Sequence, residues 1–362
     1  MKNVALVFFP SQNGVALEHG KAFIEEFPQN GYSFSEVKFL CATEDESAVE
    51  CISALEESDN IAVFSDGERV SAISQKVSSM KKIALAGDGL GSGILSDGEK
   101  TAFFISLQDK EYVKKICIPY LNSKYSTRYE RAVIRAVGAS PNQVSSLIAK
   151  AKGFGGEWLS FRSRFEREES IVEIFYDGKA PKLLIDDVMR LFVEGLGETV
   201  YALDDTPLEV QLVRLLKLRK KKISLAESFT GGGIAKKIVS VSGASEVYFE
   251  GLNTYSEQSK SLRLGVSDYT LNTFGAVSDA TAYEMAAGLL QTGYTDIAIA
   301  TTGLAGPNSD RSELPVGLSY IAVGTKEKIF VYRYKLDGTR EEITEKAITY
   351  ALFHAYKHLK NM

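Results

Sequence analysis

Residues 223–238 have the sequence ISLAESFTGGGIAKKI, which joins an expected strand to an expected helix through a glycine-rich turn. The apolar run ends at Ala226, and a helical pattern begins after Thr230. Ser228 therefore follows the carboxyl end of a strand and precedes a helix, where open α/β sheets bind their ligands. Free N–H groups and the positive end of the helix dipole favour a phosphate or a developing oxyanion at such a turn.

This turn has two interpretations. Ser228 or Thr230 caps the following helix, which is the common use of a hydroxyl at this position. Alternatively, Ser228 is a nucleophile, and Gly231 and Gly232 let a ligand approach the backbone closely. Position alone leaves both interpretations open.

A nucleophilic serine needs a base, and histidine is scarce in this sequence. His19 lies in the N-terminal part, while His354 and His358 are one turn apart on the last expected helix. That spacing suits a metal but is more common on a solvated helix face. Lysine is the other frequent partner of serine, and Lys260 follows an expected strand. As a base it must lose its proton, which requires a pKa below about 10.4, whereas an isolated lysine is usually a surface residue.

Composition sets broad limits on the function. The chain has 362 residues, a hydrophobic fraction of 44% and a formal charge of −5, so we expect two or three globular domains and no nucleic-acid or basic membrane surface. Cys41, Cys51 and Cys117 lack metal-ligand spacing and predict reduced thiols in a cytoplasmic protein. No apolar stretch approaches the length of about 20 residues that crosses a membrane, and MKNVALVFFP predicts a first strand instead of a signal peptide.

Three segments follow from the hydrophobic patterns. Residues 1–125 alternate strands and helices, which predicts a mostly parallel sheet; their GDGLGSG run precedes an expected hairpin and is not a dinucleotide fingerprint. Residues 126–203 form a small α+β unit in which YERAVIRAV, residues 129–137, is expected to be helical. Residues 206–362 predict a three-layer α/β domain.

The third segment has the clearest element pattern. Thr339 and Glu342 form an expected capping box at its last helix. The pattern predicts helices at 207–219, 231–240, 278–291 and 340–359, a short helix from Glu257, and strands at 222–226, 246–255, 296–302, 316–324 and 328–336.

Six ordered stretches between residues 225 and 343 resemble the C-terminal domain of the competence/damage-inducible protein CinA family. They are LAESFTGGGIAKKI, GASEVYFEGLNTYSEQSKSLRLGV, FGAVSDATAYEMAAG, IAIATTGLAGP, PVGLSYIAV and DGTREEI. The resemblance implies nicotinamide mononucleotide (NMN) deamidase activity, which releases ammonia and leaves nicotinic acid mononucleotide. We therefore expect a small-molecule nucleotide substrate, no cofactor, no metal and a homo-oligomer, namely a dimer. The middle segment, which ends in GETVYALDD, also resembles the family's middle domain.

The same resemblance implies roles for individual residues. It makes Ser228 the nucleophile and Lys260 its partner, with a functional Tyr255, Thr302 and Arg340. The expected catalytic residues are thus Ser228, Lys260, Tyr255 and Thr302, and the expected substrate-binding residues are Thr230, Gly231, Gly232, Gly303 and Arg340.

Some positions depart from the family pattern. Phe229 stands where the family usually has cysteine, Thr344 replaces a common second arginine, and the loop after Pro307 reads NSDRSEL instead of a glycine-rich stretch. The first segment resembles molybdopterin-binding folds, but its FSDGERVS stretch lacks the family's metal-binding aspartate pair. We expect a degenerate domain that has lost its ADP-ribose pyrophosphatase activity.

Two functions remain in competition. One is an NMN amidohydrolase in which the N–H groups of residues 229–232 stabilise the oxyanion. The other is a non-catalytic nucleotide-binding or scaffold protein of the same family. Retention of Ser228, Lys260, Thr302 and Arg340 favours the enzyme, and the altered loop after Pro307 favours the scaffold.

Overall fold

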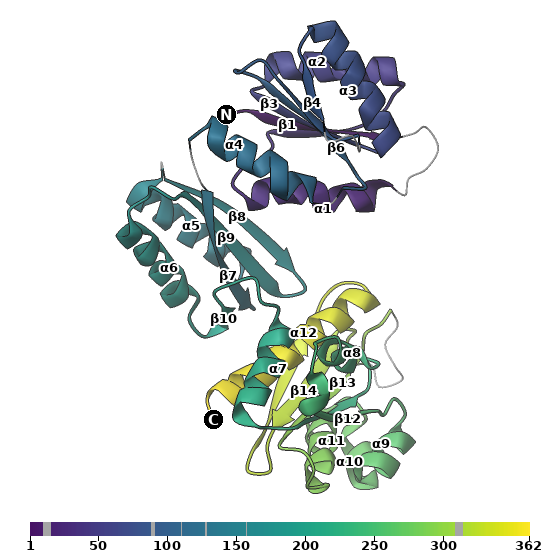
Figure 1. The fold of residues 1–362 in the computed structure, drawn as a ribbon. Helices are drawn as coiled ribbons and strands as arrows, with labels where there is room; N and C mark the ends of the chain where they lie inside the picture. The colour runs from purple at the N-terminus through teal and green to yellow at the C-terminus, as the bar shows by residue number, and fades with distance from the viewer. Residues whose placement is uncertain (10–15, 88–90, 110, 127–128, 157, 308–313) are drawn as a thin grey trace. The chain divides into compact units, whose positions relative to one another are not determined.

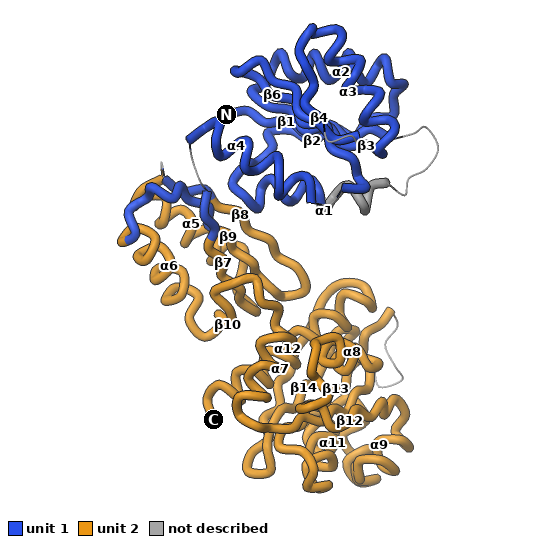
Figure 2. Tube along the Cα trace, viewed as in Figure 1, with its two compact units in different colours: residues 1–131, 157–160, 174–182 blue, residues 132–156, 161–173, 183–362 orange. Residues whose placement is uncertain are grey.

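The computed structural model describes residues 1–9, 16–87, 91–109, 111–126, 129–156, 158–307 and 314–362, with the side chains of residues 16–22 also left out. The chain separates into two compact units (Figure 2). Unit 1 comprises residues 1–131, 157–160 and 174–182, and unit 2 comprises 132–156, 161–173 and 183–362. The described residues form three sheets, which confirms the mixed α/β class. The boundaries of the three expected domains stay a prediction.

The first sheet, in unit 1, has the strand order β2-β1-β3-β6-β5-β4. Its first four strands are parallel, and β5 runs antiparallel to both of its neighbours, β6 and β4. The pairing of β5 with β6 confirms the expected hairpin after Gly93. Side chains of β1 alternate between two cores: Leu6 packs toward α2 and α3, and Val7 packs toward α1 and α4. The elements are β1 (Asn3–Phe9), α1 (Ala16–Gln29), β2 (Glu36–Cys41), α2 (Glu44–Glu57), β3 (Asn60–Ser65), α3 (Gly67–Lys81), β4 (Leu85–Gly87), β5 (Gly93–Ser96), β6 (Thr101–Ser106), η1 (Val113–Cys117) and α4 (Ile118–Lys124).

The second sheet corrects one expectation. Residues Tyr129–Val137 form strand β7 and not a helix, between β10 and β9 in the order β10-β7-β9-β8. The β-branched Val133, Ile134 and Val137 suit a strand, and pairing on both sides outweighs the helix-like spacing of the apolar residues. The other elements are α5 (Pro141–Gly155), β8 (Leu159–Glu166), β9 (Glu169–Asp177), α6 (Lys182–Leu196), η2 (Gly197–Thr199) and β10 (Val200–Ala202).

The third sheet, in unit 2, has the order β12-β11-β13-β14-β15. Strand β11 pairs in parallel with β12 and β13, and β14 and β15 add antiparallel strands at one side. The elements are α7 (Leu208–Arg219), β11 (Ile223–Glu227), α8 (Gly233–Val239), η3 (Ala244–Glu246), β12 (Tyr248–Asn253), α9 (Glu257–Leu264), α10 (Asp268–Phe274), α11 (Asp279–Gln291), β13 (Ile297–Gly303), β14 (Leu318–Gly324), β15 (Ile329–Lys335) and α12 (Arg340–Lys360).

Helices cover both faces of this sheet, which confirms the three-layer arrangement (Figure 1). Leu225 of β11 faces a core shared with α7, α8 and α12. Ala226, the next residue, faces a core shared with α9 and α11. The capping box of Thr339 and Glu342 is confirmed, whereas helix α10 was not predicted from the sequence.

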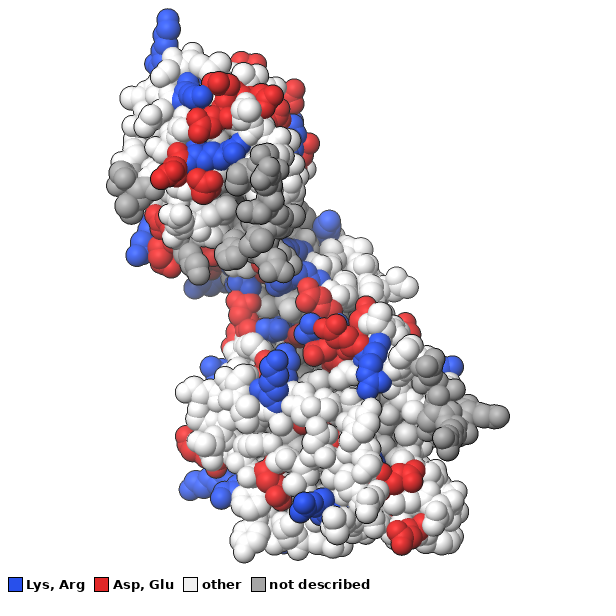
Figure 3. Space-filling model, turned by 90° about the vertical axis from the view of Figure 1, so that its right-hand side faces the viewer, with Lys and Arg blue, Asp and Glu red and all other residues white. Residues whose placement is uncertain are grey.

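The surface and the thiols agree with an ordinary globular chain. On the face drawn in Figure 3, basic and acidic side chains are interspersed, as 42 basic and 47 acidic residues predict. All three cysteines are free thiols. In the described ranges, no helix has both the length and the apolar character needed to cross a bilayer.

Candidate active site

Three hydroxyl residues form a row where three neighbouring strands end. Glu227 of β11 lies opposite Asn253 of β12 and Thr301 of β13. The next residues, Thr254, Ser228 and Thr302, therefore follow one another across the sheet, with adjacent strands about 4.8 Å apart. Alternation along β11 and β13 directs Ser228 and Thr302 toward the α9–α11 layer, the side that Ala226 and Ala300 also face.

Lys260 reaches this row from helix α9. Its ammonium donates to Ser228 Oγ at 3.0 Å, to the Thr254 carbonyl at 2.8 Å and to the Tyr255 carbonyl at 3.3 Å. The side chain is only 1% exposed, and Ser228 is 7% exposed. The structure thus brings the expected nucleophile and its expected partner into direct contact.

The contacts of Lys260 suit both of its protonation states. Burial lowers the pKa of Lys260 to about 8, against a smaller opposite effect from Glu257 one turn away. A neutral amine keeps two N–H groups for the Thr254 and Tyr255 carbonyls, and its lone pair then faces the Ser228 hydroxyl. Roughly a quarter of the lysine is neutral at pH 7.5 with this pKa, against about one part in a thousand for a solvated lysine. The geometry therefore supports a base.

The cap of helix α8 is neither Ser228 nor Thr230, which corrects one expected interpretation. Glu227 accepts from the backbone N–H groups of Gly232 (3.0 Å) and Ile234 (3.1 Å) through one carboxylate oxygen, and of Ala235 (2.9 Å) through the other. This carboxylate is 2% exposed. The N-terminus of α8 is therefore occupied by the chain's own anion and is closed to a substrate phosphate, contrary to the expectation of free N–H groups there.

The backbone donors of the turn are correspondingly fewer than expected. The N–H of Gly231 donates to the Ser228 carbonyl at 3.1 Å, and that of Gly232 donates to Glu227. In the described part of the chain, the N–H groups of Phe229 and Thr230 have no hydrogen-bond partner. Of the four expected oxyanion donors, the N–H groups of Phe229 and Thr230 are therefore the two that remain available. Gly231 and Gly232 have φ angles of +61° and +92°, so the turn itself requires them.

Of the other expected site residues, Thr302 faces the Ser228–Lys260 pair, whereas the Thr230 hydroxyl does not. The Thr302 hydroxyl donates to the Ala276 carbonyl at 2.6 Å, so toward a ligand it is left as an acceptor. The hydroxyls of Thr230 and Thr301 bond to each other at 2.7 Å, on the opposite face of the sheet. A Cβ at Gly303 would lie 2.9 Å from the ring of Phe229, so glycine makes room for this bulky neighbour of Ser228.

Arg340 and Tyr255 lie together at the rim. The Arg340 guanidinium donates to the Gly306 carbonyl at 2.7 Å and to the Tyr255 hydroxyl at 3.2 Å. The Tyr255 ring is 64% exposed, so its phenol lies with Arg340, and only its carbonyl contacts Lys260. Thr344, which replaces a second arginine, donates to the Arg340 carbonyl. The altered loop at 308–313 lies outside the described residues.

The paired histidines serve the fold of α12. His354 bonds to the Tyr334 hydroxyl at 2.6 Å and His358 to the Tyr332 hydroxyl at 2.8 Å, both on β15. Burial lowers the pKa of His354 to about 3. Within the ranges that the structure describes, no cluster of three or more His, Cys, Asp or Glu side chains is arranged to hold a metal ion. His19 lies outside the described side chains.

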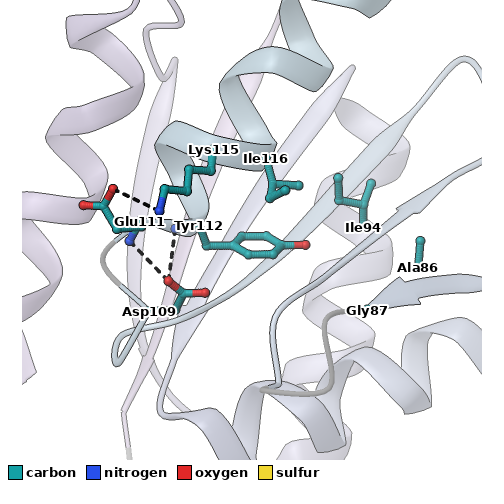
Figure 4. A pocket seen from close by; sticks show the side chains of 8 residues that line it. All are labelled: Ala86, Gly87, Ile94, Asp109, Glu111, Tyr112, Lys115 and Ile116. Carbon is teal, nitrogen blue, oxygen red and sulfur yellow. Dashed lines mark hydrogen bonds and ion pairs between the residues drawn. The ribbon is translucent and has the colours of Figure 1, made fainter.

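Unit 1 contains a cavity of about 470 Å³ that is separate from this site (Figure 4). Tyr112, Ile94 and Ile116 form much of its wall. Asp109 accepts from two backbone N–H groups, and Glu111 pairs with Lys115 at 3.8 Å. These carboxylates are engaged locally, so we locate the candidate site from the Ser228–Lys260 contact and not from cavity size.

Comparison with known proteins identifies the CinA family. The family model for the CinA C-terminal domain matches residues 205–359. A protein of Caldicellulosiruptor saccharolyticus named "Putative competence-damage inducible protein" is 36% identical over 245 residues, which cover 67% of this chain and 59% of that protein. A CinA-like protein of Kosmotoga olearia is 43% identical over 169 residues, which cover 47% of this chain and 41% of that protein. The chain thus spans less than two thirds of the length of these relatives.

Solved structures with CinA names are also similar. A CinA superfamily protein from Klebsiella pneumoniae is 30% identical, with 43% of this chain and 97% of that chain covered and a TM-score of 0.42. The competence/damage inducible protein CihA from Agrobacterium tumefaciens is 35% identical, with coverages of 42% and 95% and a TM-score of 0.38. None of these names states a substrate.

The lowered pKa of Lys260 predicts how Ser228 reactivity depends on pH. The rate of covalent modification of Ser228 by a fluorophosphonate should rise with pH through a midpoint near 8, because the neutral amine accepts the serine proton. Glu257→Gln should move the midpoint lower, since that carboxylate raises the pKa. Modification rates followed by mass spectrometry between pH 6 and 10 measure both.

Lys260→Met is the control for this experiment, because it keeps an unbranched side chain of similar size and removes the base. Its modification rate should be low and nearly independent of pH. A rate equal to that of the unaltered protein, or an unaltered-protein midpoint near 10.5, would show that Lys260 does not activate Ser228.

Proposed function

The chain belongs to the CinA family, and from this premise we propose that it is a nicotinamide-nucleotide amidohydrolase. The reaction converts NMN and water into nicotinic acid mononucleotide and ammonia. The observation that carries the proposal is the buried Lys260 ammonium 3.0 Å from Ser228 Oγ. A non-catalytic scaffold has no use for a buried lysine with a lowered pKa in contact with a serine hydroxyl.

Acylation needs two proton transfers, one from Ser228 to Lys260 and one from Lys260 to the leaving nitrogen. The neutral Lys260 amine takes the Ser228 proton as Oγ bonds to the carboxamide carbon, and the carbonyl electrons move onto oxygen. The N–H groups of Phe229 and Thr230 stabilise this oxyanion. Lys260 then protonates the nitrogen, the C–N bond breaks and ammonia leaves. Water, activated by the same amine, hydrolyses the ester and restores Ser228.

Thr302 has a separate role in this proposal. Because its hydroxyl proton is engaged by the Ala276 carbonyl, the oxygen can only accept a further hydrogen bond. The carboxamide NH₂ is a donor, and an ester oxygen is not. Thr302 therefore recognises the amide and orients the leaving nitrogen.

Arg340 is the proposed phosphate ligand. Two of its five N–H donors are used by Gly306 and Tyr255, so others remain for the phosphate. Tyr255 links the two cationic side chains, because its hydroxyl accepts from Arg340 and its carbonyl accepts from Lys260. A cation that contacts neither Ser228 nor Lys260 directly fits a substrate whose phosphate is remote from its amide.

The first segment has no corresponding support for catalysis, and we propose that it lacks ADP-ribose pyrophosphatase activity. In the FSDGERVS stretch, Asp66 caps helix α3 by accepting from the Arg69 N–H at 3.0 Å. Glu68 is in the first turn of the same helix. Both carboxylates of the stretch therefore have positions explained by the helix terminus.

Ammonia release from NMN tests the function directly. The full chain should release ammonia and form nicotinic acid mononucleotide, and Ser228→Ala should lower kcat by at least about 1,000-fold. Stability should fall by only about 1 kcal/mol, because one hydrogen bond with Lys260 is lost.

Ser224→Ala is the matched control. Ser224 is buried on β11, the strand that precedes Ser228, and its hydroxyl has no hydrogen-bond partner among the described residues, so its removal should leave kcat unchanged. Full activity of Ser228→Ala would refute the nucleophile, and no ammonia from the unaltered chain would refute the function.

Arg340→Ala should separate binding of the phosphate from chemistry. Loss of a charge-assisted hydrogen bond costs about 1.5–3 kcal/mol, so KM for NMN should rise about 10- to 150-fold. Slow hydrolysis of plain nicotinamide, which has no phosphate, should change little. Arg333→Ala, an exposed arginine on β15, is the control. Equal losses on both substrates would show that Arg340 supports the catalytic core instead.

Thr302→Val should change selectivity between amide and ester. The valine keeps the shape and removes the acceptor, so kcat/KM for NMN should fall about 10-fold. The methyl ester of nicotinic acid mononucleotide, which lacks the NH₂ group, should be hydrolysed nearly as before. Thr302→Ser keeps the hydroxyl and should retain the amide preference. An unchanged amide-to-ester ratio in Thr302→Val would contradict the role of Thr302.

A further inference from the structure

Glu227 has no part in the chemistry above, yet it adjoins Ser228 and is almost fully buried. Its backbone lies between β12 and β13, where its carbonyl accepts from the Thr254 N–H at 2.8 Å. Its carboxylate accepts from three N–H groups of the first turn of α8, at 2.9–3.1 Å. One residue is therefore fixed at both ends, by the sheet and by the helix.

The turn between these two anchors contains the reacting groups. It starts at Ser228, whose N–H donates to the Thr301 carbonyl at 3.1 Å, and ends at Gly231 and Gly232. Both glycines have positive φ and open space around the Cα, so no side chain of their own holds this part of the turn. The turn is closed by the bond from the Gly231 N–H to the Ser228 carbonyl and by the bond between the Thr230 and Thr301 hydroxyls, and the Glu227 carboxylate adds the side-chain link from the strand end to the N–H groups of α8.

We propose that Glu227 is a positioning residue for the serine turn, which keeps Ser228 toward Lys260 and the N–H groups of Phe229 and Thr230 toward the substrate oxygen. This inference rests on the proposed function. The carboxylate also neutralises the positive end of α8, so that the substrate anion is not drawn to the wrong place. Glu227 acts through the turn and touches neither the substrate nor the reacting atoms.

Removal of the carboxylate should alter catalysis more than binding. A displacement of about 1 Å in a reacting group lowers rates by up to about 100-fold, so Glu227→Ala should lose about 100-fold in kcat. Glu227→Gln keeps one acceptor oxygen and should lose about 10-fold. KM for NMN should stay within about threefold in both, because Arg340 and its contacts are unchanged.

Added formate provides a readout that a merely structural role does not give. In Glu227→Ala the freed N–H groups of α8 surround the vacated space, and formate should bind them and raise kcat several-fold. Chloride at equal ionic strength should not. Ser140→Ala, which removes the cap of α5 in another part of the chain, should lower the melting temperature without changing kcat.

Two results would overturn the inference that Glu227 positions the serine turn. It is wrong if Glu227→Gln keeps the kcat of the unaltered chain, or if Glu227→Ala loses activity only in step with its folded fraction and formate does not help. If the unaltered chain releases no ammonia from NMN, the proposed function fails instead. Fluorophosphonate modification of Ser228 then decides the inference, since Glu227→Gln should still be modified about 10-fold more slowly.

Discussion

The pairing of β11 between two parallel neighbours is the constraint on which the site depends. Because Glu227 is level with Asn253 and Thr301, the residues that follow all three strands emerge side by side. A shift of one residue in either pair would turn Thr254 or Thr302 to the opposite face, since side chains alternate along a strand. The row of hydroxyls is therefore a consequence of register, and the short side chains beneath it, such as Ala226 and Ala300, leave α9 close enough for Lys260 to reach the row.

The pKa of Lys260 explains why its surroundings must be fixed by the register of β11, β12 and β13. A pKa lowered from 10.5 to about 8 corresponds to about 3 kcal/mol in favour of the neutral amine. Burial provides this bias, and the Thr254 and Tyr255 carbonyls limit it by solvating the ammonium. More burial without these carbonyls would destabilise the fold, and more exposure would leave the lysine protonated and unreactive. A base near neutral pH thus requires both the enclosed position and the two carbonyl acceptors.

The sequence predicts features that depend on neighbouring residues, and it does not predict contacts between residues that are far apart in the chain. The strand–turn–helix around Ser228 and the capping box at Thr339 follow from adjacent residues. Lys260 came from resemblance, because 32 residues separate it from Ser228 and no periodicity links them. The strand at 129–137 was mistaken for a helix, since its apolar spacing fits both and partners on two sides decide. Glu227 was overlooked, although an acid directly before a glycine-rich helix start is a signal for a cap.

In the proposed function, an arginine binds the substrate phosphate, and the two helix N-termini that border the site account for this choice. Helix α8 is closed by Glu227, and at α12 the Glu342 carboxylate accepts from the Thr339 N–H at 2.7 Å. Such termini are common phosphate sites, but here acidic side chains of the chain itself lie at both, with Glu227 at α8 and Glu341 and Glu342 in the first turn of α12. The positive charge must come from a side chain, and Arg340 lies one residue after the α12 cap with its guanidinium held by Gly306 and Tyr255. In the proposed function, these carboxylates at the helix ends thus leave recognition of the phosphate to the Arg340 guanidinium.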